Sequence, residues 1–234
     1  TGLQNTGNTI YFYNYNSNIG LELEISDFIR TIIGKTNGAG IWLWVAEIKY
    51  LVDTNIQRAK ISSDLCDNLY IVSNIYENSQ TIIYDINRNT YNLPLSTSKQ
   101  ILVALYLGNG NVNWIARVGG EQNQYGGNTV VDGSGNAYVS GFGNKPVFYN
   151  KNNQINQTGI LEDGDYLWVG KICFNGNWEW NVRITNINEI DNAIMTNDID
   201  CNLYIGFIAN DTMVPEFYNA NNNLSITGNY NEAV

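Results

Sequence analysis

The side chains that could do chemistry in this sequence are acids, amides and aromatic residues, because its 234 residues include no histidine. Histidine is the commonest side chain for proton transfer near neutral pH and the commonest ligand of transition metals. Ser-His-Asp, Cys-His and HExxH chemistry are therefore excluded. One catalytic chemistry that needs no histidine is that of two carboxylates acting on a glycosidic bond.

Two patterns of acidic residues are candidates for such chemistry or for metal binding. Glu22 and Glu24 alternate with leucines in "GLELEIS", and an exposed strand face explains this pattern better than a paired acid and base. The segment "DGSGN", from Asp132 to Asn136, is similar to part of a calcium loop, but one carboxylate per turn supplies too few oxygen ligands. We therefore expect no catalytic residue, no metal site and no cofactor, and a protein that is not an enzyme.

A stretch of amide side chains at 119–127, "GGEQNQYGG", is the candidate ligand site, because it is a polar connection between two predicted strands. Its residues with suitable side chains are Gln122, Asn123, Gln124 and Tyr125. They can exchange hydrogen bonds with a small ligand, although a solvated loop would have the same composition. The chain also has 6 Trp and 16 Tyr, and exposed aromatic rings stack on sugars in many lectins. Most of these rings recur at fixed spacings, which favours packing.

Charge and cysteine content restrict the partners and the compartment. The 12 Lys and Arg against 22 Asp and Glu give a formal net charge of -10, which disfavours nucleic acid and anionic membranes as partners. No apolar run is long enough to span a bilayer. The three cysteines, Cys66, Cys173 and Cys201, form no disulfide framework and suit a reducing compartment such as the cytoplasm. The abundance of Asn, Ile and Tyr is typical of an AT-rich genome, so a virus or a protist is the expected source.

The pattern Asp-xxx-Asn-x-Tyr has three occurrences that are spaced almost evenly along the chain. It spans 64–70, 132–138 and 198–204, so successive occurrences begin 68 and 66 residues apart (132 − 64 and 198 − 132). The Asp carboxylate can accept hydrogen bonds from backbone N–H groups of a short turn, and Gly or Asn tolerates the positive φ that the turn requires. The pattern therefore predicts three hairpins whose second strand carries the Tyr.

Three further markers repeat in the same order. They are an Asn-Gly turn at Asn37, Asn109 and Asn175, a strand around Trp44, Trp114 and Trp180, and an aromatic patch around Tyr13, Tyr84, Tyr149 and Tyr218. Apolar and polar residues alternate in the strands, and no helical period separates them. Four strands per unit, joined by hairpins and loops, predict an all-β protein made of four-stranded antiparallel sheets, each of which is a β-propeller blade.

The segment "VVDGSGNAYVSG" at 130–141 resembles the repeat of the bacterial SBBP-type β-propeller family, whose pattern runs Val-Asp-Ser-x-Gly-Asn-Val-Tyr-Val-Thr-Gly. The matching residues are Asp132, Gly135, Asn136, Tyr138, Val139 and Gly141. The flanking occurrences, "DLCDN" and "DIDCN", lack the glycine. The resemblance implies a propeller fold and carries no activity, and the chain would be a viral or protist member.

The markers divide residues 1–234, a single repeat domain, into three blade equivalents. Residues 1–52 are expected to form an outer half-blade, 53–119 and 120–187 two complete blades, and 188–234 an inner half-blade with a tail. Propellers use about four to eight blades, so three blade equivalents are too few to close a ring.

We therefore expect ring closure through a second copy of the chain, which gives a homodimer with six blades. The two half-blades would each expose a bare strand edge, and edges of this kind pair with other chains. The edge residues are expected to be Phe28, Ile32, Asn202, Tyr204 and Ile208. A nine-bladed trimer and a longer native chain that supplies the missing blades are the alternatives.

The leading functional hypothesis is a non-enzymatic interaction or assembly module on a propeller scaffold, with an unidentified protein or glycan as further partner. A carbohydrate-binding propeller is the first alternative. A glycoside-processing enzyme with two carboxylates is the weaker one.

Overall fold

The computed structural model describes residues 8–25, 29–51, 59–159, 164–187, 193–208 and 214–227. These residues form twenty β-strands and no helix, which confirms the all-β prediction. No helix with the length and apolar character of a membrane span is found in this part of the chain.

The described strands are all arranged as antiparallel hairpins of consecutive strands. The ten hairpins are β1 (Asn8–Tyr13) with β2 (Ile19–Ile25), β3 (Ile29–Thr36) with β4 (Trp42–Tyr50), β5 (Lys60–Ser63) with β6 (Leu69–Ile75), β7 (Thr81–Tyr84) with β8 (Thr90–Asn92), β9 (Gln100–Tyr106) with β10 (Val112–Gly119), β11 (Gln124–Val131) with β12 (Ala137–Gly143), β13 (Val147–Tyr149) with β14 (Ile155–Thr158), β15 (Tyr166–Ile172) with β16 (Trp178–Thr185), β17 (Ile194–Asn197) with β18 (Leu203–Gly206), and β19 (Glu216–Tyr218) with β20 (Leu224–Thr227).

The hairpins are of three kinds, which follow one another along the chain in a fixed order. Aromatic hairpins contain the aromatic patches and are β1–β2, β7–β8, β13–β14 and β19–β20. Tryptophan hairpins contain the Trp strands and are β3–β4, β9–β10 and β15–β16. Aspartate hairpins contain the three evenly spaced Asp-xxx-Asn turns and are β5–β6, β11–β12 and β17–β18. The aromatic hairpin β7–β8 has a turn of the same form, which begins at Asp85. Residues are called equivalent below when they lie equally far from the turn in hairpins of the same kind.

A complete sheet contains one hairpin of each kind. These three hairpins are not consecutive, because a hairpin of another sheet lies between each of them and the next along the chain. The two complete sheets have six strands each, in the orders β5-β6-β9-β10-β13-β14 and β11-β12-β15-β16-β19-β20. The prediction of four-stranded sheets was therefore wrong for these two. The first four strands of each order are the predicted ones, but the aromatic patch is itself a short hairpin that adds two strands to the sheet.

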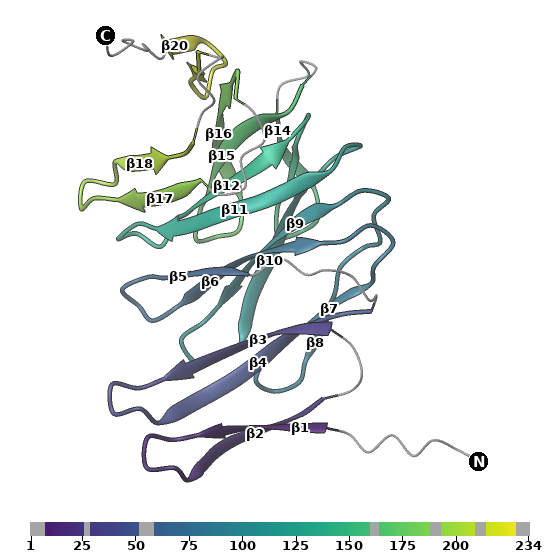
Figure 1. Cartoon of the computed structure of the whole chain (residues 1–234), viewed down its shortest axis with the longest axis vertical. Helices are drawn as coiled ribbons and strands as arrows, with labels where there is room; N and C mark the ends of the chain where they lie inside the picture. Colours follow the sequence, from purple (N-terminus) through teal and green to yellow (C-terminus); the bar gives the residue numbers. More distant parts are fainter. Residues whose placement is uncertain are drawn as a thin grey trace.

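The other hairpins belong to incomplete sheets. The four-stranded sheet β3-β4-β7-β8 has no aspartate hairpin beside β3, and β1–β2 and β17–β18 each form a two-stranded sheet. Figure 1 shows the sheets stacked in sequence order, with β1–β2 at one end and β17–β18 near the other. The described part of the chain is thus an open stack and does not close into a ring.

The Asp-xxx-Asn turns have the hydrogen bonds that the sequence predicts. The Asp132 carboxylate accepts from the backbone N–H groups of Ser134 and Asn136, both at 2.9 Å, and from the Asn136 amide and the Tyr138 hydroxyl. Gly135 has a φ of 77°, which glycine adopts at little cost. The turns that begin at Asp64 and Asp198 have the same bonds to the residues two and four positions later.

The predicted Asn-Gly turns are equivalent in the second and third tryptophan hairpins, but the one at Asn37 is not. The turns of the tryptophan hairpins place Gly40, Gly110 and Gly176 at equivalent positions, with φ of 71°, 87° and 81°. The Asn-Gly pairs at Asn109 and Asn175 end on these glycines, but the pair at Asn37 lies two residues earlier. Asn37 instead begins its turn, where its side chain accepts from the backbone N–H groups two and four residues later, as the aspartates do.

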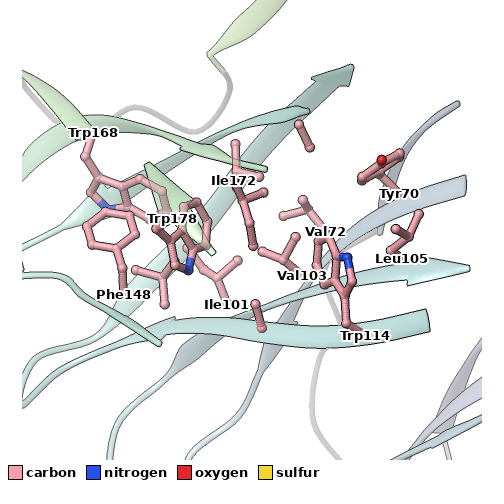
Figure 2. Packing of buried hydrophobic residues seen from close by; sticks show 14 of the residues in the cluster. Tyr70, Val72, Ile101, Val103, Leu105, Trp114, Phe148, Trp168, Ile172 and Trp178 are labelled. Atoms are coloured by element: carbon pink, nitrogen blue, oxygen red, sulfur yellow. The ribbon is translucent and has the colours of Figure 1, made fainter. Parts of the chain in front are cut away.

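The core lies between successive sheets. In Figure 2 aromatic rings fill the space between the two complete sheets, where Phe148 meets Trp168 and Trp178 edge-on, with ring centroids 5.2 and 4.9 Å apart. A second cluster, with Trp44 and Ile48, joins the four-stranded sheet to the first complete sheet. Each sheet therefore buries its faces only by packing on its neighbours.

Candidate functional site

One residue of the amide segment predicted to bind a ligand, Gln124, has a structural role. Gln124 begins β11 and is fully buried (0% exposed). Its amide donates to the carbonyl of Asn144 at 2.6 Å, and its side-chain oxygen accepts from the Trp168 indole at 3.2 Å. Because both ends of this side chain have protein partners, Gln124 is not available to a ligand.

The other members of this segment face outward to different degrees. The Asn123 side chain accepts from the backbone N–H of Lys99 at 2.9 Å, and Tyr125 is half-buried with the Lys99 ammonium 5.1 Å from its ring centroid. Gln122 is exposed. Ligand binding through Gln122, Asn123 or Tyr125 stays a prediction.

The edge of β18 exposes residues that are buried at equivalent positions. Tyr204 is 56% exposed, whereas the equivalent Tyr70 and Tyr138 are 0% and 3% exposed. Ile208 is 89% exposed, whereas the equivalent Asn74 and Phe142 are 6% and 8% exposed. The difference has a plain structural cause, because β6 and β12 each pair with a tryptophan hairpin, whereas within the described ranges β18 has no such neighbour.

The remaining predicted edge residues have different surroundings. Asn202 is exposed, and its side chain and backbone N–H donate to Asp198 within the turn. Ile32 is half-buried on β3, whose outer side carries no strand in the described residues. Phe28 lies outside the described residues.

Sequence reasoning missed a cluster of three polar side chains beside each of the first two tryptophan hairpins. In the first hairpin Glu47 is 1% exposed and pairs with Arg30 at 2.5 Å and with Arg88 at 2.7 Å. Arg88 comes from the turn of the aromatic hairpin β7–β8 and lies over the Tyr84 ring. The buried carboxylate is thus neutralised by two guanidinium groups, without which its burial would be costly.

The equivalent cluster in the second tryptophan hairpin has a reversed charge. Arg117 replaces the glutamate, and its Nε and Nη1 donate to Asn153 at 2.8 Å and to Gln100 at 2.7 Å. These amides are equivalent to the two arginines of the first cluster. The guanidinium lies 3.5 Å from the Tyr149 ring centroid. Burial lowers the pKa of Arg117 from its usual value, but an arginine keeps its charge at neutral pH.

A groove of about 650 Å³ lies beside this second cluster. It is bounded by β8 and the two residues after it, by β10, and by the turn between β13 and β14. Its polar lining includes Asn92, Asn113, Arg117, Lys151 and Asn152. In the sequence, a charged residue lies three positions after each repeated Trp, namely Glu47, Arg117 and Arg183. This spacing alone does not indicate a groove.

The acidic residues that were weighed for chemistry do not gather into a site. Burial alone would raise the pKa of Asp132, but hydrogen bonds from Asn136, Ser134 and Tyr138 hold it below its usual value. This carboxylate is engaged in its turn. Glu22 is exposed on β2. Among the described residues, no three Cys, Asp or Glu side chains lie close enough together to hold a metal ion.

No protein-family model matches the chain, and no curated protein matches it.

Proposed function

We propose that this protein is a non-enzymatic interaction and assembly module, and that it binds a second copy of itself by adding the β18 edge of one chain to the β3 edge of the other. The observation that carries the proposal is the exposure of Tyr204 and Ile208, whose equivalents are buried in both complete sheets. Exposed strand edges with apolar side chains pair readily with other chains.

The two complete sheets supply the register for this pairing. Tyr70 lies opposite Leu105 in the first sheet, and Tyr138 lies opposite Lys171 in the second. The residue of β3 equivalent to both partners is Lys35, so the proposed pairing sets Tyr204 opposite Lys35 of the second copy. Ile208 is then opposite Thr31 by the same count.

Trp180 gives independent support for a tryptophan hairpin at this place. Trp44 and Trp114 are almost fully buried, and their indoles donate to carbonyls in the turn of the next tryptophan hairpin, those of Gly108 and Phe174. Trp180 is only half-buried, and among the described residues no further tryptophan hairpin follows it. In the proposed assembly its indole would donate to the carbonyl of Gly38 in the second copy.

Two copies joined at both edges would give six complete sheets, which lies in the range of closed β-propellers. The proposed propeller, and with it the proposed relation to the SBBP-type repeat, rests on the order of the hairpins and on the markers of the sequence. A trimer or a longer native chain would complete the same edges, so the mass of the assembly distinguishes these closures.

The test compares two exposed isoleucines, Ile199 in the turn of β17–β18 and Ile208 two residues after β18. Ile208→Asp is expected to convert a dimer of the 234-residue chain to a monomer, because it would bury a charge at the proposed contact. Ile199→Asp is the matched control, because Ile199 is 97% exposed and the equivalent Leu65 is 89% exposed in a complete sheet. Sedimentation velocity at micromolar concentration measures both. A folded wild-type monomer, or equal dimerisation of the two variants, would refute the proposal.

A further inference from the structure

We propose that the groove beside Arg117 binds a sugar that carries a carboxylate, such as a hexuronic acid, with Arg117 as the anchor of the carboxylate. The groove has a volume of about 650 Å³, which is in the range of small-molecule sites. This site is independent of the strand edges on which the proposed assembly depends.

The first argument concerns the charge of Arg117. Its two hydrogen-bonding partners in the cluster, Asn153 and Gln100, are neutral amides that orient the guanidinium without cancelling its charge. In the first tryptophan hairpin the same place holds Glu47, whose charge is matched by two arginines. No carboxylate in the described residues forms an ion pair with Arg117. A half-buried, oriented cation of this kind is a ready partner for a planar carboxylate.

The second argument concerns the lining of the groove. The chain has 22 acidic residues against 12 basic ones, yet the described residues that line this groove include Arg117 and Lys151 and no acid. The charged side chains that line the groove are therefore both cationic, on a protein whose net charge is -10. An anionic ligand is favoured here, and a cationic ligand is disfavoured.

The third argument selects a sugar from the possible anions. The groove is lined by the exposed amides of Asn92, Asn113 and Asn152, and Tyr91 lies beside them, half-buried. Amides offer both donors and acceptors, which match the hydroxyl groups of a sugar, and an aromatic ring suits the apolar face of a pyranose. A simple carboxylate would use the arginine alone and leave these amides unused.

The experiment measures binding of methyl β-glucuronide to the full chain by NMR titration, beside methyl β-glucoside and acetate. We expect saturable binding of the glucuronide, at least tenfold weaker binding of both the glucoside and acetate, and weakening by added salt. Arg117→Gln is expected to lower affinity for the glucuronide at least tenfold. Lys60→Gln, which removes the same charge outside the groove, is expected to leave the affinity unchanged.

Each contrary outcome has a distinct meaning. Equal binding of glucoside and glucuronide would overturn the role of the carboxylate, and equal binding of acetate would reduce the groove to a bare anion site. No saturable binding of the glucuronide up to about 10 mM would also reject the proposal. Thermal unfolding shows whether Arg117→Gln remains folded. If it does not, Asn113→Ala, at an exposed position in the groove, must weaken binding of the glucuronide for the proposal to stand.

Discussion

Asp132 shows how much a single side chain can contribute to a short turn. Its carboxylate organises the reversal between β11 and β12 by accepting from two backbone N–H groups, one amide and one hydroxyl. A backbone N–H that is left without a partner in a buried turn costs free energy, so one acceptor that serves several donors is efficient. The same arrangement explains why the residue type at this position recurs in the sequence.

Asp132→Ala is expected to lower the free energy of unfolding by about 2–3 kcal/mol at pH 7, since it removes the shared acceptor of the part-buried turn donors and of the buried Tyr138 hydroxyl. The folded-state pKa of Asp132 lies below its usual value, so its contribution is complete above about pH 4 and is lost as the pH falls through the folded-state pKa. Urea denaturation of wild type and variant at pH 7 and near pH 3 measures this. The difference between them should shrink at the lower pH.

Asp200→Ala is the control for this prediction. Asp200 is an exposed carboxylate in the equivalent turn of β17–β18, where its backbone N–H, and not its side chain, takes part in the turn. The expected change is within about 0.5 kcal/mol. An Asp132→Ala variant as stable as Asp200→Ala would contradict the account of the turn.

The strands of neighbouring hairpins approach one another so closely that some positions require glycine. Gly141 lies opposite Trp168 between β12 and β15, and a Cβ on Gly141 would lie 2.1 Å from Cζ2 of the indole. Trp168 is itself fully buried against Phe148, so it cannot move aside without cost.

Gly141→Ala is therefore expected to destabilise the protein by about 1–3 kcal/mol, as overpacked core positions do. Gly133→Ala, in the turn eight residues earlier, is the matched control, because a Cβ there meets nothing within 4 Å. Thermal and urea unfolding of the two variants provide the comparison. Equal stability of the two would mean that β12 and β15 adjust more readily than their packing implies.

Pairs of positions within the tryptophan hairpins vary together in size. A Cβ on Gly34 would lie 2.6 Å from the Trp42 ring, and one on Gly170 would lie 2.8 Å from the Trp178 ring. At the equivalent places the second tryptophan hairpin has Ala104 and Val112. Where the other two hairpins have glycine beneath an indole, the second has a slightly larger alanine and a smaller valine. The packed volume is therefore similar in all three.

The elements with long alternating strands or with Asp-xxx-Asn turns could be predicted from the sequence, and the short aromatic hairpins β13–β14 and β19–β20 could not. Strands β13 and β19 have three residues each, which is too short for a period of two to be recognised. Their turns use Asn150 and Asn219 in the role that Asp132 has elsewhere, and Asn is so abundant in this chain that it gave no signal.

The candidate sites were predictable to a smaller extent for a similar reason. Gln124 has the composition of a binding loop, but Trp168 and Asn144, which lie 44 and 20 residues away, occupy its side chain. The neutral partners of Arg117 come from β9 and from the turn of the aromatic hairpin β13–β14, which the sequence analysis had not recognised as a hairpin. Contacts of this kind depend on tertiary structure, and local patterns do not carry them.

At the scale of the whole molecule, the interleaving of hairpins limits how two copies can join. An aromatic hairpin pairs in its sheet with one tryptophan hairpin and packs its face on the next one, as β13–β14 does with β10 and with Trp178. Strand β19 already pairs with β16, and β1–β2 already packs on Trp42 through Phe12. In the proposed junction of β18 with β3 of a second copy, β19–β20 stays paired with β16 of its own copy. By the same rule, β1–β2 of the second copy would have to pair with that β16 as well.

Only one of the two hairpins can pair with β16 at the proposed junction. We therefore expect removal of either one to strengthen dimerisation. Removing residues 1–25 or residues 214–234 alone is expected to tighten dimerisation about tenfold, because about 1.4 kcal/mol of displacement cost disappears. Removing both segments is expected to weaken dimerisation, because the edge of β16 then has no aromatic hairpin. Analytical ultracentrifugation of the three truncated chains measures the effect. Weaker dimerisation in both single truncations would show that the hairpins occupy different places, and the head-to-tail junction would then be wrong in its geometry even if a dimer forms.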